Sequence, residues 1–124
     1  MAIAADTQAL ARAAAAALDD KKGLDIVLLD VHELLVITDI FVIASGNTPR
    51  QVQALTDGLE EVLGTQDRKP LRREGKDDAQ WVLLDYGDIV VHVFDTPTRD
   101  FYDLERLWGD APRLDAQLPV TSET

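Results

Sequence analysis

Two short runs of apolar residues constrain the fold of this chain more than any other feature of its sequence. Residues 26–29 read IVLL and residues 40–44 read IFVIA, and neither run alternates apolar with polar residues. Because successive side chains of a strand point to opposite faces of a sheet, a strand that is apolar throughout needs cover on both faces. The two runs therefore predict buried strands of an α/β domain.

A helix start follows the second run directly. Residues 45–47 (SGN) break the strand, Thr48 can cap a helix, Pro49 suits the first helical position, and Gln51 can reach back as in a capping box. This helix is expected to end near Gly64. Its predicted buried face carries Val52, Leu55, Leu59, Val62 and Leu63. A phosphate-binding turn explains residues 45–48 less well than a helix cap does, because they contain one glycine and no lysine follows.

The alanine-rich beginning of the chain predicts a second helix, over residues 6–19. Asp6 or Thr7 is expected to cap it, and Gly23 supplies a stop just beyond its end. The stripe that should dock this helix on the domain consists of Leu10, Ala14 and Leu18.

Three more elements are predicted after the middle of the chain. Residues 81–86 and 89–94 have strand patterns and are divided by a turn that contains Gly87, so we expect a hairpin. Residues 100–108 predict a short helix that Gly109 closes. The apolar residues expected on one side of this helix are Phe101, Leu104 and Trp108.

The order of these elements predicts one mixed α/β domain. A short strand is expected near the basic residues that precede the hairpin, which gives a mixed sheet of about five strands flanked by helices. We expect residues 1–110 to form the domain. Residues 111–124 mix Pro, Ser and Thr with scattered apolar residues, and predict a flexible C-terminal tail.

The charge of the chain restricts its partners. Twelve Lys and Arg residues stand against 23 Asp and Glu residues, so the formal net charge is −11. Phosphate backbones repel such a chain, so binding of nucleic acid over its whole surface is not expected. A basic protein is the favoured partner, because opposite charges speed encounter.

Several other classes of protein are excluded or disfavoured by composition. The chain has no cysteine and only two histidines, which removes disulfides, thiolate sites and histidine-rich metal sites. No apolar run approaches the length of a membrane span, and no secretory signal is recognised at the N-terminus. We therefore expect a cytoplasmic protein with no cofactor and no membrane partner.

Candidate catalytic residues have simpler structural explanations. Asp25, Asp30 and Asp39 flank the first two strands and could meet at a metal ion, but Asp is also common at strand ends and in turns. His92 shares a strand face with Val90 and Phe94, so it is better explained as a buried histidine than as a general base. No catalytic residue and no metal site are therefore predicted.

Two patterns near the hairpin point to binding. The basic residues of the stretch 68–76 could touch RNA phosphates, although charges that protect an edge strand from aggregation explain them more simply. Trp81 shares a strand face with Leu83 and Asp85. A Trp beside Leu and Asp suits a hot spot for a basic partner as well as it suits a core, and the sequence leaves these interpretations balanced.

Four motifs together resemble the Iojap-like ribosomal silencing factors. They are ITDIFVIASGNTPRQVQAL (residues 37–55), REG (73–75), WVLLDYGDIVVHVF (81–94) and RDFYDLERLWGDA (99–111). The last two are long and distinctive in combination. The resemblance covers residues 25–111 and leaves out the alanine-rich helix and the tail.

This resemblance implies a fold similar to nucleotidyltransferases, without their catalytic carboxylates, and a protein that forms homodimers. It implies binding to ribosomal protein fourteen of the large subunit, which would block the small subunit and repress translation. Minor rRNA contact is a secondary expectation. The partner-binding residues that it implies are Glu74, Trp81, Leu83, Asp85 and His92, with Tyr102, Glu105 and Trp108 as weaker candidates.

Two rival functions remain open at the level of sequence. One is a nucleotidyltransferase-like enzyme that uses Asp30, Asp39 or Asp88 with magnesium, against which stands the absence of a Gly-Ser followed closely by an Asp-x-Asp pair. The other is a dimeric adaptor without a ribosomal role.

Overall fold

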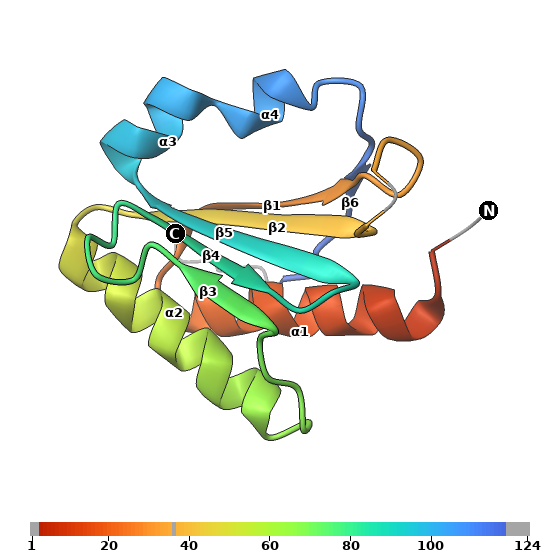
Figure 1. Cartoon of the computed structure of the whole chain (residues 1–124), viewed down its shortest axis with the longest axis horizontal. Coiled ribbons are helices and arrows are strands. Elements are labelled where there is room, and N and C mark those ends of the chain that lie inside the picture. The colour runs from red at the N-terminus through yellow and green to blue at the C-terminus, as the bar shows by residue number, and fades with distance from the viewer. Residues whose placement is uncertain (1–2, 36, 119–124) are drawn as a thin grey trace.

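A six-stranded mixed sheet forms the centre of the computed structural model, which describes residues 3–35 and 37–118 (Figure 1). The strands are β1 (Leu24–Asp30), β2 (Ile40–Gly46), β3 (Arg72–Glu74), β4 (Trp81–Asp85), β5 (Ile89–Asp95) and β6 (Arg113–Leu114). Their order across the sheet is β3-β4-β5-β2-β1-β6. Strands β2 and β5 are parallel, and the other neighbours are antiparallel. The predicted mixed sheet is confirmed, with one strand more than the five expected.

Helices cover both faces of this sheet. Helices α1 (Ala5–Asp20) and α2 (Pro49–Gly64) lie against one face, and α3 (Thr96–Tyr102) and α4 (Leu104–Leu107) lie over the other (Figure 1). Every residue of β2 and β5 is buried as a result. This confirms the prediction that the run at residues 40–44 is covered on both faces. The run at residues 26–29 is only partly buried, because β1 lies next to the two-residue strand β6.

Helix α2 begins as its sequence predicted. The Thr48 hydroxyl accepts a hydrogen bond from the Gln51 backbone N–H at 3.1 Å, and the Gln51 side chain accepts one from the Asn47 N–H at 2.8 Å. The helix ends at Gly64, as expected. Val62 is exposed rather than buried, because it lies at the margin of the stripe that faces the sheet.

The ends of α1 differ in how well they were predicted. Neither predicted residue caps its N-terminus: Ala4 occupies the cap position without a side-chain bond, and the Thr7 hydroxyl bonds Asp88 instead. The C-terminus does end just before Gly23, whose N–H bonds the Leu18 carbonyl at 2.8 Å. Lys22 adopts the left-handed conformation that this helix ending requires.

The helix predicted over residues 100–108 is two shorter helices. Asp95 caps α3 by accepting a hydrogen bond from the Thr98 N–H at 3.0 Å, so this helix begins earlier than expected. Asp103 has φ +49 and interrupts the helix before α4. The interruption rotates the second helix relative to the first. Phe101 is consequently exposed and does not share the buried side of Leu104.

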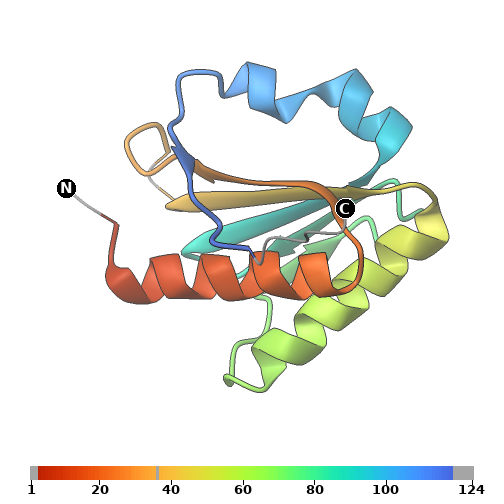
Figure 2. The ribbon, with the colours of Figure 1, turned by 180° about the vertical axis from the view of Figure 1, so that it is seen from behind.

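Part of the predicted tail is attached to the sheet. Strand β6 pairs with β1, and Ala111 is buried. Leu114, Ala116 and Leu118 pack against the core on the α1 side. Figure 2 shows this segment in blue, running from the α3–α4 layer past the edge of the sheet toward α1. Residues 111–118, which the sequence assigned to the tail, therefore pair with β1 and pack on the core, and residues 119–124 lie outside the described part of the chain.

Candidate functional site

Five predicted contact residues share one face of the sheet. Glu74 pairs with Leu83 across β3 and β4, and Leu83 pairs with His92 across β4 and β5. Residues directly opposite each other in a sheet point to the same face. Trp81 and Asp85 lie two residues either side of Leu83 and join this face by alternation. It is the face that α3 and α4 partly cover. We call these five residues the Trp81 surface.

Trp81 is held on three sides and is still partly exposed. Its indole N–H donates a hydrogen bond to His92 Nδ1 at 3.1 Å. Its ring packs against Phe94 and Tyr102, with ring centroids at 5.0 and 4.8 Å. The side chain remains half-buried. Trp81 is therefore neither a fully buried core residue nor a freely exposed one. Part of its ring is anchored in the core, and the rest is in contact with solvent.

His92 is the buried residue that holds the Trp81 indole in place. It is only 5% exposed, and its ring lies against Phe41 with centroids 4.7 Å apart. Burial lowers the pKa of His92 to about 4. The neutral ring accepts a hydrogen bond from the indole N–H at Nδ1 and carries its own proton on Nε2. This arrangement makes His92 a positioning residue for Trp81, with little surface of its own to offer a partner.

The neutral state of His92 gives the first testable prediction. The pKa of His92 is about 4 in the folded chain and 6.5 in its ordinary state. As the pH falls from 6.5 toward 4, the unfolded chain therefore takes up a proton on His92 before the folded chain does, and the free energy of unfolding decreases. Between about pH 7 and pH 5, wild type should lose about 2 kcal/mol more unfolding free energy than the His92→Phe variant. Urea unfolding at both pH values measures the difference. Equal losses would mean that folding does not lower the pKa of His92.

Glu74 borders a small cavity beside Trp81. Glu74, Gly75, Trp81 and Leu83 line this cavity, whose volume is about 280 Å³. The Glu74 carboxylate is exposed and lies 3.3 Å from Arg72. Gly75 has φ +85, and a Cβ built there would lie 2.0 Å from the Trp81 carbonyl oxygen. Gly75 therefore permits the close approach of the chain that forms the cavity. In the sequence, this residue stands out only as part of the REG motif.

Asp85 has a role in the hairpin turn. Its carboxylate accepts a hydrogen bond from the Gly87 N–H at 2.8 Å and lies 3.7 Å from Arg72. This is the structural explanation that the sequence offered for an aspartate at a turn. Among the two carboxylates of the Trp81 surface, Glu74 is therefore the one with more freedom to meet a partner.

The basic stretch before the hairpin is largely neutralised by ion pairs. Arg73 and Lys76 both contact the Glu60 carboxylate, at 2.8 and 3.1 Å, and Arg68 contacts Asp88 at 2.9 Å. Burial alone would raise the pKa of Glu60, but the hydrogen bonds from Arg73 and Lys76 hold it below its ordinary value. These pairs support the edge-strand explanation of the basic residues, since β3 is the edge strand of the sheet.

Of the three weaker candidates, one packs on the Trp81 surface and a second is connected to it only through Phe41. Tyr102 packs directly on Trp81, and Trp108 packs on Phe41, which in turn contacts His92. The structure does not bring Glu105 to this surface. Its carboxylate instead contacts Arg99 at 3.0 Å and Arg113 at 3.6 Å.

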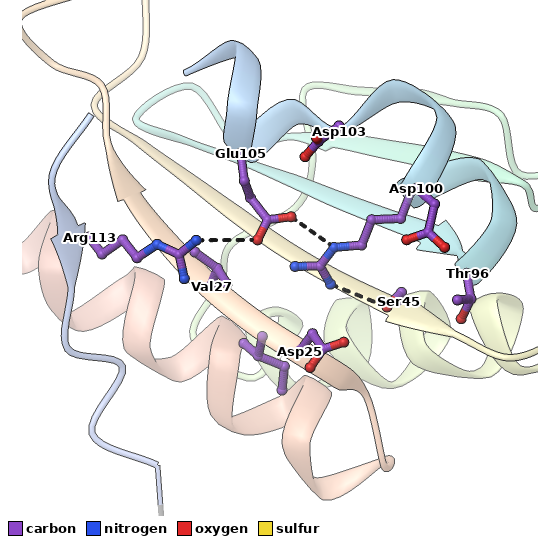
Figure 3. Close-up of a pocket in the computed structure, with 10 residues that line it drawn as sticks. Asp25, Val27, Ser45, Thr96, Asp100, Asp103, Glu105 and Arg113 are labelled. Carbon is purple, nitrogen blue, oxygen red and sulfur yellow. Dashed lines mark hydrogen bonds and ion pairs between the residues drawn. The ribbon is translucent and has the colours of Figure 1, made fainter. Parts of the chain in front are cut away.

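Glu105 lines a separate polar cavity of about 520 Å³ between α3–α4, β1 and β2 (Figure 3). Arg99 is buried there and donates to Glu105, to the Leu24 carbonyl and to Ser45 Oγ. These bonds tie the α3–α4 layer to the sheet. Within residues 3–35 and 37–118 no group of three or more His, Asp or Glu side chains could hold a metal ion. Two carboxylates of the enzyme hypothesis are engaged elsewhere: Asp30 accepts a hydrogen bond from the His32 backbone N–H at 3.1 Å, and Asp88 accepts one from Arg68 at 2.9 Å.

Sequence reasoning missed two exposed apolar side chains, Phe101 and Leu107, on α3 and α4. The signal that could have found Phe101 is the Asp95-Thr96-Pro97 sequence, which resembles the helix start at Thr48-Pro49. A helix that begins there is placed differently on the sheet from one that begins at residue 100.

Comparisons with known proteins agree with this architecture. Residues 4–124 match the sequence model of the family described as ribosomal silencing factor during starvation, RsfS. The ribosomal silencing factor RsfS of Bacillus subtilis (strain 168) is 43% identical over 108 residues, 87% of this chain and 92% of that protein. The chloroplastic protein Iojap of Arabidopsis thaliana is 32% identical over 120 residues, 97% of this chain and 49% of its own length.

A crystal structure of a protein from Chromobacterium violaceum is similar with a TM-score of 0.80 and 39% identity, and covers 82% of this chain and 85% of that chain. Within the described residues, no helix is long and apolar enough to cross a membrane. The relatives are named as silencing factors rather than as enzymes, in agreement with the prediction that the chain is a non-catalytic regulator. The chain belongs to the RsfS family of ribosomal silencing factors, as the four sequence motifs predicted.

Proposed function

We propose that this chain binds ribosomal protein fourteen of the large ribosomal subunit, at the face where the small subunit docks, and thereby represses translation. The observation that carries the proposal is Trp81, which is anchored by His92 and still partly exposed next to Glu74 and Leu83. A large aromatic residue held in one orientation is typical of an interface hot spot, because little side-chain entropy is lost on binding.

The proposed mechanism is steric and needs no chemistry. A folded domain seated on the docking face excludes the small subunit by its volume. The net charge of −11 favours a basic ribosomal protein and disfavours the surrounding rRNA. Any rRNA contact would come from the stretch 68–76, where the ion pairs leave little free positive charge. The proposed compartment is the cytoplasm, and the proposed solution state is a homodimer, which sedimentation velocity would measure.

Subunit joining is the experiment that tests the proposal. Added to separated subunits, the protein should reduce the joined-ribosome peak of a sucrose gradient as its concentration rises. It should act weakly on ribosomes already joined, because its site is then occluded. Matched magnesium and salt controls are needed, since both also shift subunit pairing. Firm binding to large subunits with normal joining would leave an adaptor and contradict the silencing mechanism.

Reversing the charge of Glu74 should weaken binding to large subunits by roughly tenfold, because a lysine there would face a basic partner across the Trp81 cavity. The matched control is Glu61→Lys, which makes the same change in net charge at an exposed position on α2. Co-sedimentation over a range of protein concentrations gives both affinities. If the two variants lose equal affinity, only the overall charge matters and the Trp81 surface is not the contact.

A further inference from the structure

Helices α3 and α4 present an apolar patch to solvent. Phe101 is 81% exposed, Leu107 is 70% exposed, and Tyr102 is 50% exposed. Together with Asp100, Asp103 and Arg106, these residues line an open hollow of about 490 Å³. We call Phe101, Tyr102 and Leu107 the α3–α4 patch. In Figure 1 the two helices that carry it form the layer on the opposite side of the sheet from α1 and α2.

The fold does not account for the exposure of these side chains. Helices α3 and α4 are held on the sheet by other residues, chiefly the buried Leu104 and the buried Arg99 with its bonds to Glu105, Leu24 and Ser45. The ring contact recorded for Phe101 is with Tyr102, at a centroid distance of 5.0 Å. Large apolar side chains that gather on a surface without supporting the core mark an interaction site.

The α3–α4 patch is continuous with the Trp81 surface. Tyr102 packs on Phe101 on one side and on Trp81 on the other, with centroid distances of 5.0 and 4.8 Å. The three rings therefore form an unbroken aromatic row from α3 to β4. A partner seated on Trp81 would meet Phe101 one ring further along.

The charges around the patch select its occupant. Asp100 and Asp103 border the hollow, against the single cation Arg106, and the chain as a whole carries −11. A second copy that placed its own α3–α4 patch here would bring Asp100 and Asp103 against the same two carboxylates, so this patch is a poor contact between copies, and the proposed homodimer is expected to form elsewhere. A basic protein that places an apolar side chain among its lysines and arginines would be attracted instead.

We propose that the α3–α4 patch is a second contact for the same basic protein of the large subunit, which inserts an apolar side chain between Phe101 and Leu107. This inference rests on the proposed function and adds a specificity element to it. The acidic border favours a basic partner, and the apolar hollow favours a partner with an exposed apolar side chain. A partner that is basic but lacks such a side chain would bind this surface less tightly.

The test uses the double variant Phe101→Ser/Leu107→Ser in the full chain. Its affinity for isolated large subunits should fall by roughly tenfold or more, as expected when two exposed hot-spot side chains are truncated. The matched control is Leu71→Ser, which removes an equally exposed side chain (77%) from the loop before β3. The single variant Leu107→Ser guards against misfolding of α3, and urea unfolding should show all three variants to be as stable as wild type.

The outcomes separate this inference from the proposed function. Normal binding by the double variant, with reduced binding by Glu74→Lys, would overturn the second contact and leave the proposed function standing. Failure of the wild-type protein to bind large subunits would overturn both. A change confined to self-association in sedimentation velocity would assign the patch to the contact between copies, and would overturn the inference as well. Reduced binding by the double and single variants, with normal binding by Leu71→Ser, is the supporting result.

Discussion

Replacing Arg99 with methionine should lower the free energy of unfolding by about 3 kcal/mol, near the lower end of the range for breaking a buried ion pair. The guanidinium is buried and bonds Glu105 at 3.0 Å, and the Leu24 carbonyl and Ser45 Oγ each at 3.2 Å. Methionine fills similar volume but satisfies none of these acceptors. The effect should not reach the upper end of the range, because Glu105 is 22% exposed and keeps Arg113 at 3.6 Å.

A double-mutant cycle tests the physical reason for this loss. If the cost comes from a carboxylate left without its cation, Glu105→Gln should recover part of the stability of the Arg99→Met variant. Urea unfolding of the two single variants and the double variant gives the coupling energy. Strictly additive losses would show that Arg99 stabilises the α3–α4 layer only through Leu24 and Ser45.

The elements that sequence predicted well are those whose signals are local. The cap at Thr48, the proline at Pro49 and the turn at Gly87 each require a particular residue at a particular position. The unbroken apolar run at residues 40–44 required cover on both faces, and β2 is buried at every residue. Such signals do not depend on where the rest of the chain lies.

The elements that were missed depend on tertiary context. Strand β6 has two residues and no pattern of its own, and exists because β1 offers a free edge next to the end of α4. The break at Asp103 requires a left-handed aspartate, which the sequence does not distinguish from an exposed helical one. The Thr7 hydroxyl donates a hydrogen bond to Asp88, 81 residues away along the chain, and does not cap its own helix.

The candidate surface was only partly predictable for the same reason. Alternation along β4 placed Trp81, Leu83 and Asp85 on one face, and the register of the sheet added Glu74 and His92. Family resemblance suggested Glu105 as well, but its place opposite Arg99 follows from the break at Asp103. The exposure of Trp81 could not be decided from sequence, because it depends on how far α3 and α4 cover the sheet.

Truncating Trp81 to alanine should reduce the affinity for large subunits by about 30-fold or more, the effect of removing an interface hot spot. The indole contributes the exposed area next to Glu74 and Leu83, and it supports Tyr102 at 4.8 Å. Its removal therefore takes away one proposed contact and loosens the aromatic row that leads to the α3–α4 patch. Co-sedimentation with large subunits at a fixed salt concentration measures the loss.

The same change should also destabilise the fold, since the indole packs on Phe94 and donates to His92. The loss should be smaller than the 3–5 kcal/mol expected, to order of magnitude, for a fully buried aromatic residue, because part of the ring is already in water. Leu84→Ala is the matched control. It lies on the same strand but is fully buried on the α1–α2 side of the sheet, so it lowers stability without altering the Trp81 surface. If Leu84→Ala binds normally and Trp81→Ala does not, the loss of affinity belongs to the contact. Equal binding by both variants and wild type, at concentrations where all are folded, would mean that the partner does not meet Trp81.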